Sequence, residues 1–386
     1  MINKTVICQC KIQNGITLND KKMLLNIDIS KSITNLEVLT CYKLLFSKEG
    51  LIKNIGSYIF LLILILYIIF AFLFYSKGFD YLCNQINEIL NVKNIEIETQ
   101  KNSRKIIKDE KKYKDNISGC SLNNSKTNNK NNYKVSIDNQ SNINLNISQS
   151  TFKDLEKTIK YTDYEINIIT YEEAIENDKR TIFQIYISLL KQKNIFLFAF
   201  CPNNDYNSSI IKICLLLFSI SLYLLINTLF FNEAMIHKIY EDKGHYNFIY
   251  ILPRLFYIII ICYIIINNFV KFLFLSHKNI LEIKYEKNKY NLRAKSISTV
   301  KCLIIKYISF FISNILLNIL FWYYISCFCA VYKNTQLFLL INTLISFIIS
   351  LIISFLIIII PTILRIIALK GPGKYLYKIS QYLQLI

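Results

Sequence analysis

Five long apolar runs in this sequence restrict it to one class of fold. The first, GSYIFLLILILYIIFAFLFY, lies between Lys53 and Lys77 and contains no charged residue. A helix needs about 20 consecutive apolar residues to cross the roughly 30 Å hydrocarbon core of a bilayer. The other four runs occupy about residues 213–232, 248–270, 307–330 and 337–360. Lipid offers the backbone no hydrogen-bond partners, so such runs must be helical, and they lack the alternating pattern of a membrane barrel. The sequence therefore predicts an all-α, multi-pass transmembrane helical protein with about five spans.

Basic residues beside the spans predict which side of the membrane each connection occupies. Lysine and arginine in short connections stay on the cytoplasmic side. The segment after the third span carries Lys271, Lys278, Lys284, Lys287, Lys289, Arg293, Lys295, Lys301 and Lys306, whereas the connection between spans four and five holds one lysine, Lys333. This bias predicts an outer tail at 1–54, a first span at 55–75, a cytoplasmic segment at 76–209, a four-helix transmembrane region at 210–360 and a cytoplasmic tail at 361–386. We expect the protein in the plasma membrane.

The same basic segment is a candidate for binding anionic lipids of the inner leaflet. Each basic residue near such a surface contributes about 1 kcal/mol before salt screening. The residues that we expect to face lipid head groups are Lys284, Lys287, Lys289, Arg293 and Lys295. The alternative is a solvated segment that serves only as a topology signal.

The predicted cytoplasmic segment combines a polar insert with a helix. Residues of about 91–150 are rich in Asn, Lys and Ser, so they offer too little apolar surface to offset their ordering entropy and are expected to be disordered. Their basic runs lack aromatic interleaving, so we expect no nucleic-acid partner. Thr170 and Glu173 have capping-box spacing, which predicts a helix over about 171–193.

Three cysteines crowd the predicted outer tail. Cys8, Cys10 and Cys41 would pair in an oxidising environment, which makes them disulfide candidates. Three is an odd number, so a further partner would lie upstream in a longer precursor. The alternative is that these thiols are apolar packing residues.

The sequence contains no catalytic or nucleotide-binding motif. G-x-S-x-G, Walker A, G-x-G-x-x-G and H-E-x-x-H patterns do not occur. His237, Glu241 and His245 are spaced by four, but Gly244 interrupts their helix and no further metal ligand is close by. We therefore expect no enzyme activity, no cofactor and no metal, and assign this stretch to a solvated outer loop.

Uncharged polar residues recur every four positions in the last two spans. Asn314 and Asn318 lie in the fourth run, and Asn342, Ser346 and Ser350 lie in the fifth. Such stripes face one direction, and small or amide side chains allow close helix approach and hydrogen bonds between helices. We interpret them as an interhelical polar stripe. The alternative is the lining of a pore or substrate path.

One arginine lies inside a predicted span. Arg254 follows Pro253 in the first turns of the third run, where an unpaired charge costs about 2.5 kcal/mol or more. The side chain either extends to the outer head groups or pairs with Glu233, at the end of the second run, as a charge clamp between the two helices.

Four stretches carry a resemblance to known proteins. KLLFSKEGLIKNIGSYIF, DYEINIITYEEAIENDKRT, FFNEAMIHKIYEDKGHYNFIY and FWYYISCFCAVYKNTQ together resemble a large family of uncharacterised protist multi-pass membrane proteins with cysteine-rich ectodomains. A fainter similarity, in the order of spans two to five, is to the membrane region of polycystin-1-like proteins. The first resemblance implies a surface receptor or adhesion-type membrane anchor that ends an ectodomain at Cys8 and Cys10. The second implies the alternative, a channel or transporter component. Beyond the lipid bilayer, neither implies a particular partner.

Overall fold

The structure, a computed structural model, describes residues 35–95, 161–202, 205–231, 236, 248–286 and 289–385, and within these residues its regular elements are all helices. Five helical stretches in this part of the chain are long and apolar enough to cross a membrane. They are Ile55–Ile95, Ser209–Leu229, Arg254–Phe274, Asn291–Val331 and Lys333–Lys370. Each overlaps one of the five apolar runs, so the predicted all-α, multi-pass architecture is confirmed.

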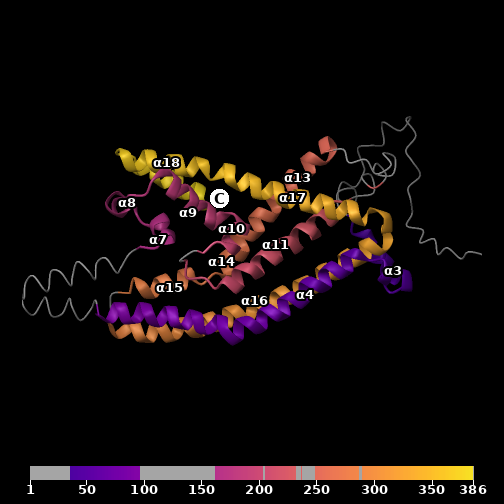
Figure 1. Ribbon diagram of the computed structural model, residues 1–386, viewed down its shortest axis with the longest axis horizontal. Helices are drawn as coiled ribbons and strands as arrows, with labels where there is room; N and C mark the ends of the chain where they lie inside the picture. The colour runs from indigo at the N-terminus through magenta and orange to yellow at the C-terminus, as the bar shows by residue number, and fades with distance from the viewer. Residues whose placement is uncertain are drawn as a thin grey trace, which may run out of the picture.

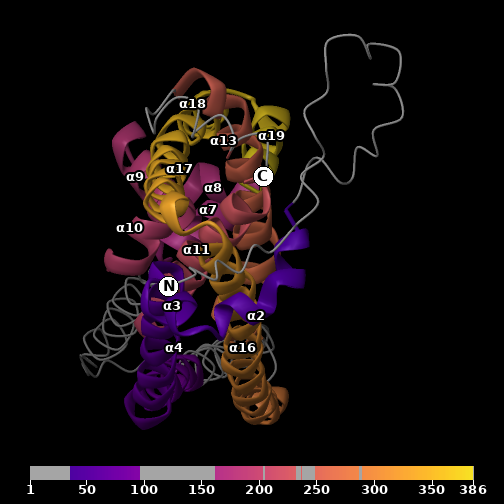
Figure 2. The ribbon, with the colours of Figure 1, turned by 90° about the vertical axis from the view of Figure 1, so that its right-hand side faces the viewer.

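The first and fourth spans are much longer than a bilayer requires. α4 (Ile55–Leu73) continues through a π-helical turn, η3 (Phe74–Gly78), as a helix to Ile95, and α16 runs from Lys289 to Val331 over 43 residues. At about 1.5 Å per residue, α16 is roughly 65 Å long, about twice the thickness of the hydrocarbon core. α4 and α16 lie side by side as a pair (Figures 1 and 2). Their extra length carries both helices beyond the apolar region toward one end of the molecule.

The core of the bundle is built around the second span. α11 (Ser209–Leu229) contacts α4, α16, α13 (Phe248–Tyr263) and α17 (Gln336–Ile357). Figure 2 shows it between the α4–α16 pair and α17. The third span continues through a π-helix, η4 (Ile264–Val270), into α14 (Lys271–Phe274), and the fifth continues from α17 into α18 (Ile359–Lys370).

Shorter helices gather at the two ends of the bundle (Figure 1). One end, here called the outer end after the predicted topology, holds η2 (Glu37–Cys41), α2 (Tyr42–Leu45), α3 (Lys48–Ile52) and the turn η5 (Lys333–Thr335). The opposite end, called the inner end, holds α7 (Asp163–Ile168), α8 (Tyr171–Asn177), α15 (His277–Lys284) and α19 (Lys374–Leu385). The segments predicted to be cytoplasmic therefore meet at one end of the molecule, as a five-span chain requires.

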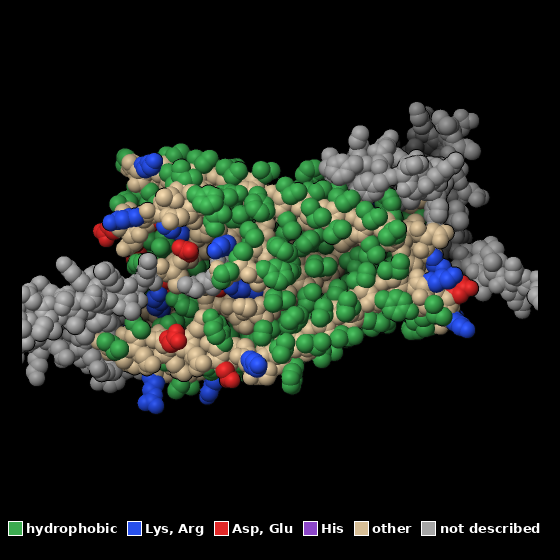
Figure 3. Space-filling model, in the orientation of Figure 1, with side chains coloured by type: hydrophobic (Ala, Val, Ile, Leu, Met, Phe, Trp, Pro, Cys, Tyr) green, Lys and Arg blue, Asp and Glu red, His purple; other side chains and the backbone are tan. Residues whose placement is uncertain are grey.

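The surface of the bundle carries a wide apolar region. Figure 3 shows hydrophobic side chains over the middle of the molecule and charged side chains toward its two ends. Phe72 is 73% exposed, Ile305 69% and Leu337 64%. A continuous exposed apolar surface of this kind is unfavourable in water and suits contact with lipid, so the structure is compatible with an integral membrane protein.

The helix predicted over 171–193 is interrupted. The capping box of Thr170 and Glu173 is present and starts α8, but α8 ends at Asn177 and α9 (Ile182–Lys193) begins with a second capping box, that of Thr181 and Gln184. The prediction of one helix was therefore wrong. The helix ends where Asp178 turns inward to bind two arginines, described below. α9 is followed by α10 (Ile195–Phe200).

Two other segments also differ in form from their predictions. The basic segment 271–306, predicted to be a loop, forms α14, α15 and the first turns of α16. Of the insert predicted to be disordered at about 91–150, residues 91–95 continue the helix of the first span, and the rest lie outside the described residues.

Candidate functional site

Charged side chains at the inner end form a buried layer between the short inner helices and the inner ends of the spans. It is organised around three carboxylates, Glu165, Asp178 and Asp205, each at most 8% exposed and each paired with a lysine or arginine from another element or turn. We call this set, with its partners, the inner polar layer. Buried charges are stable only when they are paired and hydrogen-bonded, so the layer fixes how the inner helices pack on the spans.

Asp178 binds two arginines at once. Arg365 of α18, fully buried, donates from Nε to Asp178 Oδ2 at 3.0 Å, and Arg180 donates from Nε to Oδ1 at 2.7 Å. Arg365 also donates to the backbone carbonyls of Ile166 and Asn167 at the end of α7. Burial alone would raise the pKa of Asp178, but the two arginines outweigh it and the pKa is lowered. This cluster joins α18 to the turn between α8 and α9.

Glu165 is held by a lysine from α15. Lys284 Nζ lies 2.7 and 2.9 Å from the two carboxylate oxygens and 3.2 Å from the hydroxyl oxygen of Tyr206. Burial and the adjacent Glu165 carboxylate raise the pKa of Tyr206 above its usual value. Lys284, one of the residues expected to face lipid, therefore has a protein partner.

The other predicted lipid-facing residues lie in different surroundings. Lys295 pairs with Glu286 at 3.1 Å, and Arg293 is exposed on α16. Lys287 lies outside the described residues, as does the side chain of Lys289. Lipid binding by this segment stays a prediction, and Arg293 is the member that the structure leaves on the surface.

Asp205 anchors the start of the second span. Lys212 Nζ lies 2.6 Å from Asp205 Oδ1, and Asn207 Nδ2 donates to Asp205 Oδ2 at 3.1 Å. Asn207 Oδ1 accepts from the backbone N–H of Ser276 at 2.9 Å and from its hydroxyl at 3.1 Å. The turn before α11 is thus bound to the turn before α15.

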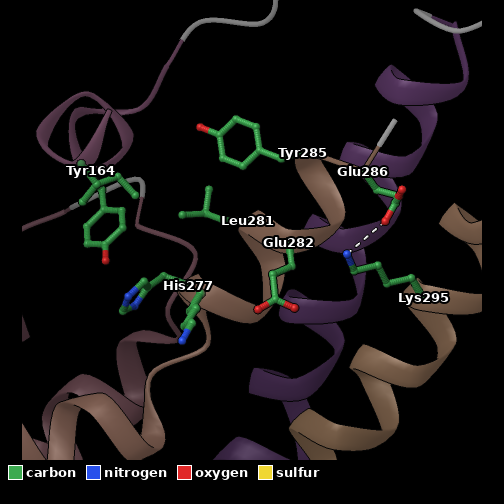
Figure 4. Close-up of a pocket in the computed structure, with 9 residues that line it drawn as sticks. Tyr164, His277, Leu281, Glu282, Tyr285, Glu286 and Lys295 are labelled. Carbon is green, nitrogen blue, oxygen red and sulfur yellow. Dashed lines mark hydrogen bonds and ion pairs between the residues drawn. The ribbon is translucent and has the colours of Figure 1, made fainter. Parts of the chain in front are cut away.

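A cavity of about 650 Å³ opens beside the inner polar layer, between α7, α15 and the start of α16. Figure 4 shows Tyr164 and His277 on one side and the Glu286–Lys295 ion pair on the other. The rings of Tyr164 and His277 are 4.5 Å apart, and His277 Nδ1 has no hydrogen-bond partner among the described residues. Burial and the neighbouring lysines lower the pKa of His277 to about 4, so this imidazole is neutral at pH 7.

The cavity does not form a recognisable catalytic or metal centre. No group of three or more His, Cys, Asp or Glu side chains with metal-binding geometry occurs in the described part of the chain. His277 and the carboxylates that line the cavity are not hydrogen-bonded to one another in that part of the chain. His237, Glu241 and His245 lie outside the described residues.

The predicted polar stripe of the fifth span does make interhelical contacts, but with the second span. Asn227 Oδ1, on α11, accepts from Asn342 Nδ2 at 3.2 Å and from the Ser346 hydroxyl at 3.3 Å. In the fourth span, Asn314 and Asn318 donate to carbonyls of their own helix. Ser350 lines a small cavity described below. Sequence spacing indicated the stripe but not its partner, Asn227.

Of the predicted charge clamp between Arg254 and Glu233, the structure describes only Arg254. Arg254 donates from Nη1 to the backbone carbonyl of Phe230 at 3.4 Å, and its guanidinium carbon lies 5.2 Å from the centre of the Phe231 ring. Arg254 therefore does contact the outer end of α11, while Glu233 lies outside the described residues. The pairing of Arg254 with Glu233 stays a prediction.

The predicted disulfide candidates are likewise seen only in part. Cys41 is buried, with its sulfur 3.9 Å from the Thr40 hydroxyl oxygen, and Cys8 and Cys10 lie outside the described residues.

Sequence reasoning missed the centre of the inner polar layer. Arg365 falls in the predicted cytoplasmic tail at 361–386, although IIPTILRIIALK places it alone among apolar residues. A lone arginine in an apolar helix implies a buried partner, so this signal was present. Glu165 and Asp178 gave no comparable signal, because both lie in polar stretches typical of a solvated helix surface.

Comparison with known proteins adds no relative from which a function follows. No protein-family model, no curated protein and no solved structure matches this chain.

Proposed function

We propose that this chain is a non-catalytic receptor- or adhesion-type membrane anchor, which holds the segment before its first span rigidly on a bundle of five membrane helices. The observation that carries the proposal is a dense set of hydrogen bonds at the outer end, here called the outer junction. It binds the residues just before α4 to the turn between α16 and α17.

Two amide side chains form the centre of the outer junction. Asn54 caps α4 by accepting from the backbone N–H of Ser57 at 2.9 Å, and its Nδ2 donates to the carbonyl of Ser326 at 2.8 Å. Gln336 accepts from the backbone N–H of Ile55 at 2.8 Å and donates to the carbonyls of Lys53 and Cys329, both at 3.0 Å. Each amide therefore satisfies backbone groups of two different segments.

The residues before this junction also lie on the bundle. Asn35 donates from its backbone N–H to the carbonyl of Leu229 at 3.0 Å, and its own carbonyl accepts from the Tyr324 hydroxyl at 2.7 Å. η2 and α2 pack along α16. The described segment from Asn35 to the start of α4 is therefore held on the bundle by hydrogen bonds and packing, as an anchor for a preceding segment requires.

The interior of the bundle favours an anchor over a channel made by a single chain. Polar side chains within the spans bond mainly to other helices or to their own backbone, as Asn227, Asn342 and Ser346 do. Among the described spans, the small cavity between α11, α13 and α17 measures about 20 Å³. That is room for one water-sized particle, whereas conduction needs a path through the bundle.

Surface display and conductance together test the proposal. A folded reporter domain fused ahead of Met1 should be labelled by antibody on intact cells, and a C-terminal tag only after permeabilisation. Purified full chain in proteoliposomes should carry no ion flux above protein-free vesicles. Flux above that background would favour the channel alternative, and labelling of the C-terminal tag on intact cells would contradict the proposed orientation.

The outer junction itself can be tested by limited proteolysis. Replacing Asn54 and Gln336 together by alanine should make the segment 35–53 sensitive to protease in detergent solution. A matched pair of exposed amide residues away from the junction, Asn84 and Asn291, replaced by alanine in the same way, should leave it resistant. Equal protease resistance of the two double variants would show that the outer junction does not hold the segment 35–53 on the bundle.

A further inference from the structure

A small polar cavity lies where the junction of α9 and α10 meets the middle of α11 and the inner parts of α13 and α17. Its volume is about 20 Å³, and its polar wall consists of Lys193, Asn194, Ser219, Tyr223, Tyr263, Ser350 and Ser354. The π-helix η4 begins at Ile264, directly after Tyr263. Such departures from regular helix geometry occur frequently at functional sites. The cavity is large enough for one water-sized particle.

Two groups in this wall lack the partners that buried polar atoms normally have. The Ser219 hydroxyl is on a residue that is 0% exposed, and it has no hydrogen-bond partner among the described residues. Lys193 is partly buried, and its ammonium makes no ion pair or hydrogen bond within the part of the chain described here. Burial lowers the pKa of Lys193 to about 8, so the group still carries its charge at pH 7. An unpaired charge in such a place is costly and attracts an anion.

The surrounding charges also favour an anion. Lys212 and Lys271 both lie near the Phe198 ring of α10, with their ammonium nitrogens 5.1 and 4.6 Å from its centre. Lys212 is paired with Asp205, while Lys271 donates to the backbone carbonyls at the end of α9 at 3.1 and 3.5 Å. Without counting Lys271, the ammonium groups of Lys193 and Lys212 outnumber the single carboxylate, Asp205, in the described part of this region. The local potential is therefore positive.

We propose that this cavity binds one small monovalent anion, chloride in the cell, held by the Lys193 ammonium and the Ser219 hydroxyl. The bound ion supplies the counter-charge that the protein does not provide and joins Lys193 of α9 to Ser219 in the middle of α11. Its size limits the site to ions close to water in volume, so chloride and bromide fit and gluconate does not. The site is independent of the anchor function proposed above.

The experiment measures thermal unfolding of the full chain in detergent, with sodium gluconate replaced stepwise by sodium chloride or bromide at constant ionic strength. We expect a saturating rise in Tm of about 2 to 5 °C when the halide reaches roughly a hundred times its dissociation constant. Lys193→Met should abolish the rise, and Ser219→Ala should shift its midpoint to about tenfold higher halide. Lys179→Met, at an exposed lysine of the same inner end, should respond like the unmodified chain.

Two results would overturn the proposal. One is equal stability in gluconate and halide, which would mean that the cavity holds water. The other is a full halide response in Lys193→Met. If that variant does not fold, crystals of the unmodified chain grown in bromide decide the matter: an anomalous peak between Lys193 and Ser219 supports the site, and its absence excludes it.

Discussion

The shared carboxylate of Asp178 leads to a prediction about how two substitutions combine. Asp178→Asn removes the counter-charge of both Arg365, whose side chain is 0% exposed, and Arg180, whose side chain is 11% exposed. Removing one partner of a buried ion pair costs about 3–5 kcal/mol, because the other charge is left buried and unpaired. Arg365→Met should cost a similar amount on its own, through the lost pair and the carbonyls of Ile166 and Asn167 that lose their donor.

The double variant should lose much less unfolding free energy than the sum of the losses in the two single variants. Once Asp178 is neutral, Arg365 is an uncompensated buried charge, so replacing it with methionine removes a cost. We expect the double variant to lose about 3–5 kcal/mol, no more than either single variant, which corresponds to a coupling energy of about 3–5 kcal/mol. The measurement is equilibrium unfolding of the full chain in detergent for the two single variants and the double variant.

An exposed ion pair provides the matched control. The charged atoms of Lys374 of α19 and Glu172 of α8 are 2.6 Å apart, closer than the 2.9 Å of the buried Arg365–Asp178 pair, but their side chains are 61% and 62% exposed. Solvent screens such a pair, so Glu172→Gln and Lys374→Met should leave stability unchanged. Additive losses for Asp178→Asn and Arg365→Met, or a loss in the control as large as that in the buried cluster, would refute the reasoning.

Three further predictions concern packing, helix contacts and acid stability. Gly56→Ala should cost about 1–3 kcal/mol in thermal melts, because its Cβ would lie 2.6 Å from Cys329 Sγ and 2.9 Å from Ile325 Cγ2. A Cys329→Ala change should recover only part of that stability, because the Ile325 contact remains, and an unaffected single variant would contradict the close approach. Asn227→Leu should cost about 0.6–2 kcal/mol, with a non-additive effect when combined with Asn342→Ala, and full additivity would argue against the bond between α11 and α17. The lowered pKa of Asp178 contributes stability that is present above its unfolded value of about 3.9 and is lost as pH falls through the folded value. Unfolding midpoints measured against pH should therefore fall less steeply below pH 4 in Asp178→Asn, and equal slopes would count against this assignment.

The structure also indicates how the two ends of the molecule are connected. α17 and α18 run from the outer junction at Gln336 to the inner polar layer at Arg365 as a nearly continuous helical stretch. A displacement at the outer end would therefore reach the inner end through a stiff element.

The sequence by itself determined the five spans and several local features. A span depends on consecutive residues, because each stretch of backbone in lipid must satisfy its own hydrogen bonds within a helix. The capping box at Thr170 depends on residues three apart, so it was equally readable, and the spacing of Asn342 and Ser346 correctly indicated a buried helix face. Such features need no knowledge of which helices become neighbours.

Only the tertiary structure decided which buried groups meet. Arg365 and Asp178 are 187 positions apart, and their pairing depends on the rotation and register of α18 against the turn after α8. The same dependence explains why Asn342 binds Asn227, why Lys284 contacts Glu165 in place of solvent, and why Lys193 is left without a carboxylate. These outcomes are set by the packing of distant helices, in which small differences in angle change every long-range contact, and no local pattern in the sequence encodes them.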